Sequence, residues 1–223
     1  KLVSVKGSYH GMTGFTMAAG DNAELCERYL LDFPEFIKVP YNDVGAMRAA
    51  VDDETACVLL EASPAQLGFP APEPGYYEAV RKICDDHGAV FILDEVQTGL
   101  GSSGCFWLWQ QQGVRPDIVT TAKGLGGGIL PNAAALMEPD IKAWFLDADF
   151  PHVSTFGGSE LGCVATAAVC DITSRPEFSA NVRRLIEQFR EGFANAPFTV
   201  NQVGLCMGLL SDTMDSYEMT RRL

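Results

Sequence analysis

Two short segments carry residues whose types could perform covalent chemistry together. The segment "FILDEVQTGLG", residues 91–101, is an apolar run that leads into Asp94 and Glu95. The segment "TTAKGLGGG", residues 120–128, places Lys123 ahead of a run of glycines. A lysine amine can form a Schiff base with a carbonyl, and a carboxylate can pair with the protonated nitrogen of a heterocycle. An acid and a lysine at neighbouring strand ends are therefore typical of an enzyme that uses pyridoxal phosphate.

The same two segments allow other interpretations. An apolar strand that ends in Asp-Glu is also how a nucleotide-hydrolysing P-loop protein presents its magnesium ligand. A phosphate loop needs glycines before its lysine and a hydroxyl residue after it, whereas Lys123 precedes "GLGGG" and is followed by Gly124. The glycine run also lacks the G-x-G-x-x-G spacing of a dinucleotide site. Singly, an aspartate after a strand is usually a cap and a loop lysine is usually solvated, so the wider pattern must decide.

The elements that must position these residues alternate between strand and helix. Short apolar runs predict strands buried on both faces; they lie at residues 2–5, 36–40, 56–61, 89–95, 117–122 and 133–137. Helical spacing predicts helices over residues 73–88, closed by Gly88, and over 160–173 and 177–196, with a late strand segment at 198–210. This order predicts an α/β fold with a mainly parallel sheet and helices on both faces, whose ligands lie beyond the carboxyl ends of the strands.

The separation of Asp94 and Lys123 agrees with this fold. It is 123 − 94 = 29 residues, which is enough for one helical crossover and a further strand. Both residues are therefore expected at the same edge of the sheet.

Composition limits the classes of partner. The chain has 223 residues, of which 47% are hydrophobic, and a formal net charge of −13, so nucleic acid and anionic membrane surfaces are not expected partners. Its seven cysteines form no C-x-x-C pair, which predicts buried free thiols in a reducing compartment. The sequence has neither an apolar run long enough to span a bilayer nor the layout of a signal peptide at its start. We therefore predict a cytoplasmic location.

Four segments in a fixed order carry a family resemblance. They are "GSYHGMTGFTMAAG", "FILDEVQTGLGSSG", "PDIVTTAKGLGGGILPNAAALM" and "STFGGSELGCVATAAV". Together they resemble the class III aminotransferases of the ornithine and 4-aminobutyrate type, within the fold-type I pyridoxal phosphate enzymes. The resemblance runs from about residue 3 to residue 210. It implies a partial cofactor-binding large domain over residues 1–174, then a linker helix and the start of a smaller α+β domain over residues 175–223.

The resemblance also implies a role for individual residues. Lys123 carries the cofactor as a Schiff base, and Asp94 pairs with its pyridine nitrogen. The other implied cofactor contacts are Gln97 at the phenolic oxygen, Val96 and Tyr9 on opposite ring faces, His10 beside Tyr9, Glu61 as a nearby acid, and Thr155. Thr155 reaches the cofactor phosphate of a neighbouring subunit, which implies a homodimer with a shared active site.

Three of these residues also have a structural alternative. Tyr9 could be a core aromatic residue and His10 an ordinary turn histidine. Thr155 could be the N-cap of the helix that follows it, although free backbone N–H groups at such a position can also meet a phosphate.

The chain departs from the family pattern on the substrate side. Where the family usually has E-P-x-Q-G-E, this chain has "EASPAQLG", with Pro64 and Gln66 in place of the glutamine and the second acid. Ser102 and Asn201 stand where arginines are usual. Asparagine cannot supply the bidentate positive partner of a carboxylate, so we expect a substrate that lacks a carboxylate at that end.

The leading hypothesis is an aminotransferase that moves an amino group from an amine or ω-amino acid to an oxo acid. Aminomutase or racemase chemistry on the same scaffold is an alternative, because function lies in the site and not in the fold. A truncated, non-catalytic homologue that serves as a dimerisation module is another. The chain starts after the family's phosphate-binding segment and stops before its C-terminal domain, so we expect it to be a fragment. A P-loop ATPase is the fourth hypothesis.

Overall fold

The computed structural model describes residues 1–147, 149, 152–213, 218–219 and 221. The strands are β1 (Leu2–Val5), β2 (Phe36–Val39), β3 (Cys57–Glu61), β4 (Val90–Asp94), β5 (Ile118–Thr121), β6 (Ala134–Met137), β7 (Thr199–Val203) and β8 (Cys206–Leu210). The α-helices are α1 (Gly14–Ala19), α2 (Ala23–Arg28), α3 (Val44–Ala50), α4 (Tyr76–His87), α5 (Trp109–Gln112), α6 (Pro139–Asp147), α7 (Glu160–Thr173) and α8 (Pro176–Gly192). Two 3₁₀ helices are η1 (Ala65–Leu67) and η2 (Lys123–Gly126).

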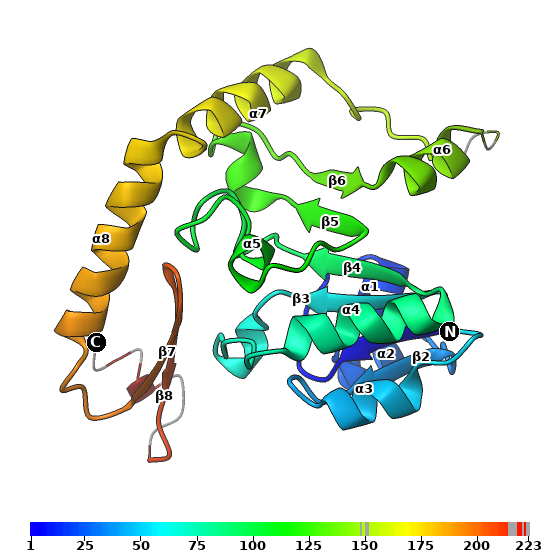
Figure 1. Ribbon diagram of the computed structural model, residues 1–223, viewed down its shortest axis with the longest axis horizontal. Coiled ribbons are helices and arrows are strands. Elements are labelled where there is room, and N and C mark those ends of the chain that lie inside the picture. Colours follow the sequence, from blue (N-terminus) through cyan, green and yellow to red (C-terminus); the bar gives the residue numbers. More distant parts are fainter. Residues whose placement is uncertain (148, 150–151, 214–217, 220, 222–223) are drawn as a thin grey trace.

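Six of these strands form one sheet in the order β2-β1-β3-β4-β5-β6. Every neighbouring pair is parallel except β5 and β6, which are antiparallel. The predicted mainly parallel α/β fold is thereby confirmed. The prediction that all six strands are buried on both faces is wrong for β6, whose first three residues are exposed. The reason is its position at the end of the strand order, away from the helices that cover the centre of the sheet (Figure 1).

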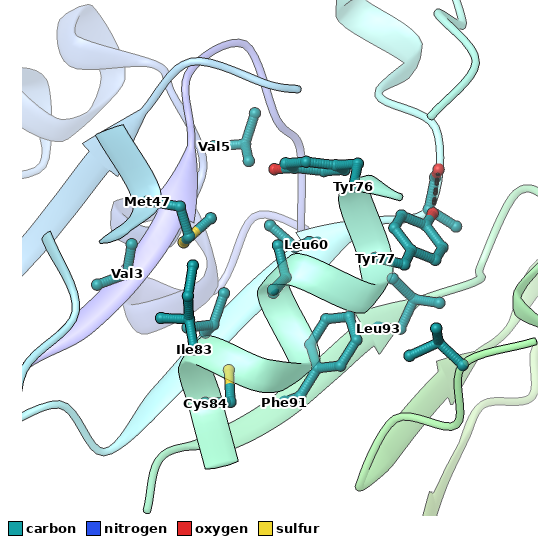
Figure 2. Packing of buried hydrophobic residues seen from close by; sticks show 14 of the residues in the cluster. Val3, Val5, Met47, Leu60, Tyr76, Tyr77, Ile83, Cys84, Phe91 and Leu93 are labelled. Carbon is teal, nitrogen blue, oxygen red and sulfur yellow. Dashed lines mark hydrogen bonds between the residues drawn. The ribbon is translucent and has the colours of Figure 1, made fainter. Parts of the chain in front are cut away.

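The main core lies between the sheet and helices α3 and α4 (Figure 2). Apolar residues recur along α4 at helical spacing, so Tyr77, Val80 and Ile83 all face the sheet and are at most 1% exposed. Phe91 and Leu93 alternate along β4 and meet this helix from the sheet. Gly88 ends α4 in the left-handed conformation, with φ of 67°, as its predicted place at the helix end requires.

The opposite face of the sheet is covered by α1 and α2 (Figure 1). Ser4 points to this face between Val3 and Val5, and its buried hydroxyl donates to the Ala19 carbonyl at the end of α1 over 2.7 Å. Helices therefore lie on both faces, as predicted, and the carboxyl ends of the central strands remain the edge at which a ligand can approach.

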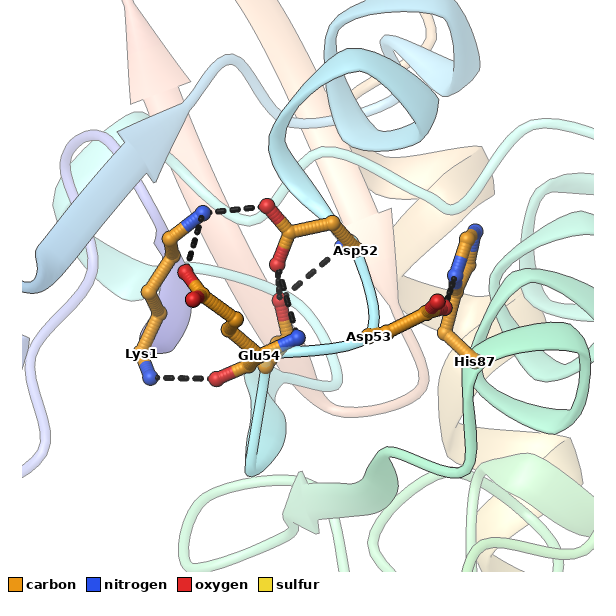
Figure 3. A network of polar contacts seen from close by, with 6 residues as sticks. Lys1, Asp52, Asp53, Glu54 and His87 are labelled. Atoms are coloured by element: carbon orange, nitrogen blue, oxygen red, sulfur yellow. Dashed lines mark hydrogen bonds and ion pairs between the residues drawn. The ribbon is translucent and has the colours of Figure 1, made fainter.

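The other edge of the sheet, where the parallel strands begin, is held by a polar network (Figure 3). The Lys1 side chain forms ion pairs with Asp52 and Glu54 in the loop before β3, and His87 contacts Asp53 over 2.6 Å. The Asp52 carboxylate is exposed, and its hydrogen bond from Lys1 lowers its pKa. This network joins the chain start, the loop and the end of α4 far from the strand ends that carry Asp94 and Lys123.

The C-terminal part of the chain extends away from the sheet along α7 and α8, with a β-hairpin beside α8 (Figure 1). Residues 198–210 were predicted to be a single strand segment, but they form the antiparallel pair β7 and β8. The reason is Gly204, which turns the chain with φ of 66°. Helix α7 ends before Ser174 and α8 begins at Pro176, close to the expected domain boundary; the division at residue 174 itself stays a prediction.

The cysteine prediction holds only in part. All seven thiols are free, but only Cys84 is buried and Cys163 is exposed on α7. The apolar run around Cys163 indicates a buried thiol, but many residues of α7 are exposed in this chain. Among the described residues, no helix is both long and apolar enough to cross a membrane.

The hairpin packs closely on the loops near the strand ends, which gives a testable prediction. A Cβ atom on Gly208 would lie 2.1 Å from the Gly68 carbonyl oxygen, and this backbone atom cannot move aside easily. We expect Gly208→Ala to lower the free energy of unfolding by about 1–3 kcal/mol, as overpacking does. Denaturant unfolding measures the change. Gly192→Ala at the end of α8 is the matched control, because its Cβ would meet nothing within 4 Å. Equal stabilities of the two variants would contradict this close packing.

Candidate active site

The carboxyl ends of β1, β3, β4 and β5 surround a cavity of about 230 Å³. Its lining comprises Tyr9, His10, Gly11, Glu61, Asp94, Val96, Gln97, Ala122 and Lys123. Seven of the eight residues proposed from the sequence thus line one cavity. The eighth, Thr155, lies in an exposed turn outside this lining. The N-cap of α7 is Ser159, so the alternative in which Thr155 caps this helix is wrong.

Strand register places the two acids of the cavity side by side. Glu61 pairs with Asp94 across β3 and β4, and Asp94 pairs with Thr120 across β4 and β5. The ladder continues beyond the strands, because the Ala62 amide donates to the Asp94 carbonyl over 3.0 Å. A parallel sheet therefore brings residues from separate βα units to one edge without any contact between them along the chain.

Asp94 is a buried carboxylate that contacts a buried histidine. Its Oδ2 lies 2.9 Å from Nδ1 of His10, and the side chains are 10% and 2% exposed respectively. Its Oδ1 accepts a hydrogen bond from the Val96 amide over 3.0 Å. A carboxylate oxygen has two lone pairs, so each oxygen can accept a further donor from the cavity.

His10 differs from an ordinary turn histidine, because its side chain is buried and contacts Asp94. Its Nε2 is buried without a hydrogen-bond partner among the described residues. Buried polar nitrogens are normally paired, so this atom is available to a water or a bound molecule. The sequence placed His10 beside Tyr9 but gave no sign that its ring contacts Asp94.

Tyr9 and Glu61 are joined by a backbone hydrogen bond. The Tyr9 side chain is exposed at 43% at the cavity, so it is not a core aromatic residue. The Tyr9 amide donates to Oε1 of Glu61 over 2.6 Å, and the Ala65 amide donates to Oε2 over 3.3 Å. Burial of Glu61 raises the pKa of its carboxyl, and the two amide donors oppose that rise.

Lys123 occupies a strained position at the start of η2. Its φ is 46°, in the left-handed region that non-glycine residues seldom adopt, and such residues often lie at functional sites. The residues that follow anchor the turn, since Leu125 and Gly126 are buried. Helix α7 supports the same turn through Thr166, whose hydroxyl donates to the Leu125 carbonyl over 3.4 Å. The lysine is thus exposed at the cavity while its backbone is fixed.

The second acid of the "DE" pair, Glu95, has a structural role that the sequence did not indicate. It is fully buried and accepts hydrogen bonds from the Thr98 hydroxyl and from the amides of Leu108 and Trp109, over 2.8 to 3.0 Å. Burial raises the pKa of this carboxyl, while these donors lower it. Glu95 therefore holds the loop that carries Val96 and Gln97. The feature of the sequence that could have indicated this role is an acid directly after a buried strand.

Two of the four positions that depart from the family pattern make internal side-chain hydrogen bonds, and none of the four lines the cavity. The Asn201 amide donates to the Gly68 carbonyl over 2.9 Å, which ties the hairpin to the loop after Glu61. The Ser102 hydroxyl donates to the carbonyls of Gln97 and Gly99. Pro64 is buried at the start of η1, whereas Gln66 is exposed.

The lining fits one heterocyclic cofactor such as pyridoxal phosphate. A buried carboxylate with free lone pairs suits a protonated ring nitrogen, and an exposed lysine at the same cavity suits covalent attachment. The unpartnered nitrogen of His10 is a further polar atom that a bound molecule or an accompanying water can satisfy. The donor set therefore matches the cofactor that the resemblance implies.

Comparison with known proteins identifies the family. The family described as "Aminotransferase class-III" matches residues 1–209. An uncharacterized aminotransferase of Archaeoglobus fulgidus is 47% identical over 195 residues, which cover 86% of this chain and 45% of the relative. The acetylornithine aminotransferase of Methanopyrus kandleri is 37% identical over 222 residues, which cover 99% of this chain and 52% of the relative. The chain therefore spans about half the length of these curated relatives.

Solved structures agree with the sequence relatives. The ornithine aminotransferase of Toxoplasma gondii ME49 superposes with a TM-score of 0.91 at 25% identity, covering 100% of this chain and 55% of that one. The N-acetylornithine aminotransferase of Stenotrophomonas maltophilia K279a gives a TM-score of 0.74 at 28% identity, covering 95% of this chain and 50% of that one. These matches do not favour the nucleotide-hydrolysing interpretation of Asp94. The chain belongs to the class III aminotransferase family, whose cofactor is pyridoxal phosphate.

Proposed function

We propose that the protein containing this chain transfers an amino group from an amine or ω-amino acid to an oxo acid. The observation that carries the proposal is one cavity that both Asp94 and Lys123 line, together with all the other predicted cofactor contacts except Thr155. Relatives named acetylornithine and ornithine aminotransferases support the same reaction class. In the complete reaction the donor amine becomes a carbonyl compound, and the acceptor oxo acid becomes an amino acid.

Each cavity residue has a proposed role that follows from the chemistry of its side chain. When bound, pyridoxal phosphate supplies an electron sink that makes the C–H bond next to the substrate nitrogen acidic. Asp94 keeps a proton on the pyridine nitrogen, because a carboxylate favours the positive form of a neighbouring ring. Lys123 would first hold the cofactor, and its freed amine would then take the proton from the donor carbon; in the return half-reaction the same amine would deliver a proton to the acceptor carbon. Val96 and Tyr9 would flank the ring, and Gln97 would lie by its phenolic oxygen.

The active site is proposed to be completed in a homodimer. Large apolar side chains are exposed in the segments that follow Lys123 along the chain, and a surface of this kind marks a protein interface. They include Ile129, Trp144, Val153, Phe156 and Leu161, each 69% to 84% exposed. Thr155 lies among them and contributes its hydroxyl to the partner's cofactor phosphate. Sedimentation of the full-length protein tests this: we expect a dimer that Phe156→Glu weakens.

An amine-transfer assay tests the reaction. The full-length protein with pyridoxal phosphate is given ω-amino acids or amines without a carboxylate, each with pyruvate or 2-oxoglutarate. We expect one new amino acid for each donor consumed, with no turnover when the acceptor is left out. Isomerisation of a single substrate without acceptor would instead support an aminomutase or racemase. Failure to bind pyridoxal phosphate would support the non-catalytic dimerisation module.

A further inference from the structure

The Glu61 carboxylate connects two loops at the mouth of the cavity. It lies at the end of β3, is only 4% exposed, and accepts the Tyr9 amide on one oxygen and the Ala65 amide on the other. Tyr9 belongs to the loop after β1, whereas Ala65 begins η1. Hydrogen bonds to a buried, ionised acceptor are stronger than neutral ones, so this single side chain fixes both loops.

Tyr9 depends on this contact more than its neighbours do. The residues before it are held elsewhere, since the Gly7 amide donates to Asp21 and the Ser8 amide and hydroxyl donate to the Val5 carbonyl. Tyr9 is 43% exposed, so core packing does not fix its ring. The next residue is held by the contact of His10 with Asp94, and the Tyr9 amide bond to Glu61, at 2.6 Å, is the contact made by Tyr9 itself that fixes the backbone carrying the ring.

Glu61 is itself held on a rigid support. The hydroxyls of Tyr41 and Tyr77 both donate to the carbonyl of Ala62, the next residue, over 2.9 and 2.6 Å. The Ala62 amide donates to the Asp94 carbonyl in the adjacent strand. The Glu61 backbone thus cannot follow Tyr9 if the contact between them is lost.

We propose that Glu61 is a positioning residue whose ionised carboxylate holds Tyr9 against the cofactor ring, so that protonation of Glu61 weakens cofactor binding. The inference rests on the proposed function only in taking pyridoxal phosphate as the ligand. In this proposal Glu61 contacts only the protein, and Tyr9 is the residue that contacts the cofactor.

The direction of the pH effect follows from the number of acceptor oxygens that the Glu61 carboxyl group offers. An ionised carboxylate offers two acceptor oxygens, and protonation turns one of them into a hydroxyl, so one amide loses its strong acceptor. Burial raises the pKa of Glu61, so this loss begins at a higher pH than it would for a solvent-exposed glutamate. The charged or titratable groups that face Glu61 are His10, Asp94 and Tyr41, and Lys123 lines the same cavity. Cofactor binding that needs the ionised form must weaken as pH falls.

The test is the dissociation constant of pyridoxal phosphate for the cofactor-free full-length protein, measured by fluorescence titration from about pH 5 to about pH 8. Glu61→Gln keeps one acceptor oxygen but turns an amide donor toward the second N–H group. We expect the variant to bind about tenfold more weakly than the wild type at the upper pH. The two proteins should converge as pH falls. The ratio of their dissociation constants removes the titration of the cofactor itself, because both proteins bind the same ligand.

Two further variants separate positioning from folding. Asp117→Asn removes the charge of another carboxylate that accepts a backbone amide, that of Phe91, but does not line the cavity. We expect it to lower the melting temperature while keeping the pH dependence of the wild type. Ala65→Pro removes only the second amide donor. The preceding Pro64 has φ of −63° and ψ of 116°, which a following proline accepts. This variant should bind the cofactor as the wild type does.

The outcomes distinguish the inference from the proposed function. If the wild type binds no pyridoxal phosphate, the proposed function is wrong. If it binds the cofactor but Glu61→Gln binds equally well at every pH, the positioning role is wrong. A loss in Ala65→Pro as large as that in Glu61→Gln would place the effect in the η1 loop and overturn the role of Tyr9. Melting temperatures of the cofactor-free proteins show whether each variant is folded.

Discussion

Lys123→Ala is expected to abolish the visible absorption of lysine-bound pyridoxal phosphate and to lower amine transfer by at least about a thousandfold. Lys123 is an exposed lysine at the cavity, and no other lysine is in its lining. In the proposed reaction its amine is needed twice, to hold the cofactor and to move the proton at the substrate carbon. Absorption spectra of the full-length protein and single-turnover assays with a donor amine measure the two losses.

Two comparisons give this prediction its controls. Lys123→Arg keeps the positive charge but offers a guanidinium that stays protonated, so we expect the same loss of absorption. Lys82→Ala changes an exposed lysine of α4 whose amine pairs with Asp86, far from the cavity, and should leave both measurements unchanged. An unchanged spectrum of Lys123→Ala would show that another amine holds the cofactor.

Asp94→Asn is expected to lower amine transfer by about a hundredfold or more, the scale of losing one preorganised electrostatic contact. The substitution preserves the size of the side chain and one acceptor, so the hydrogen bond from the Val96 amide can persist. It removes the negative charge that we propose keeps the ring nitrogen of the bound cofactor protonated. It also leaves His10 facing a neutral amide in a buried site. We expect cofactor to bind still, with an altered absorption maximum, while the rate of proton removal at the substrate carbon falls.

Asp117→Asn is the matched control for this change. Asp117 lies at the start of β5, at the opposite end of the strands, where it accepts the Phe91 amide and pairs with Arg81. Its loss should lower the melting temperature but leave the absorption maximum of the bound cofactor unchanged. A wild-type rate in Asp94→Asn would contradict the assignment of Asp94 to the ring nitrogen.

Much of the fold follows from local patterns in the sequence. The apolar run that ends at Asp94 and the helical spacing of Tyr77, Val80 and Ile83 predict β4 and α4 because burial on one face has a fixed period in each element. These local rules fail where burial depends on neighbours. Strand β6 has the apolar composition of a central strand, but its exposure follows from its place at the end of the sheet. In the same way, the single predicted segment at residues 198–210 is a hairpin whose pairing only the folded chain reveals.

The sequence by itself determined the chemical types at the candidate site and the edge of the sheet that carries them. Parallel strands joined by helices always present their carboxyl ends together, so an acid after one strand and a lysine after the next must meet at that edge. Only the tertiary structure decided which side chains contact each other there. His10 meets Asp94 across 84 residues, Tyr9 meets Glu61 across 52, and Asn201 reaches Gly68 across 133. Such contacts depend on how loops fold over the strand ends, and no local periodicity encodes that arrangement.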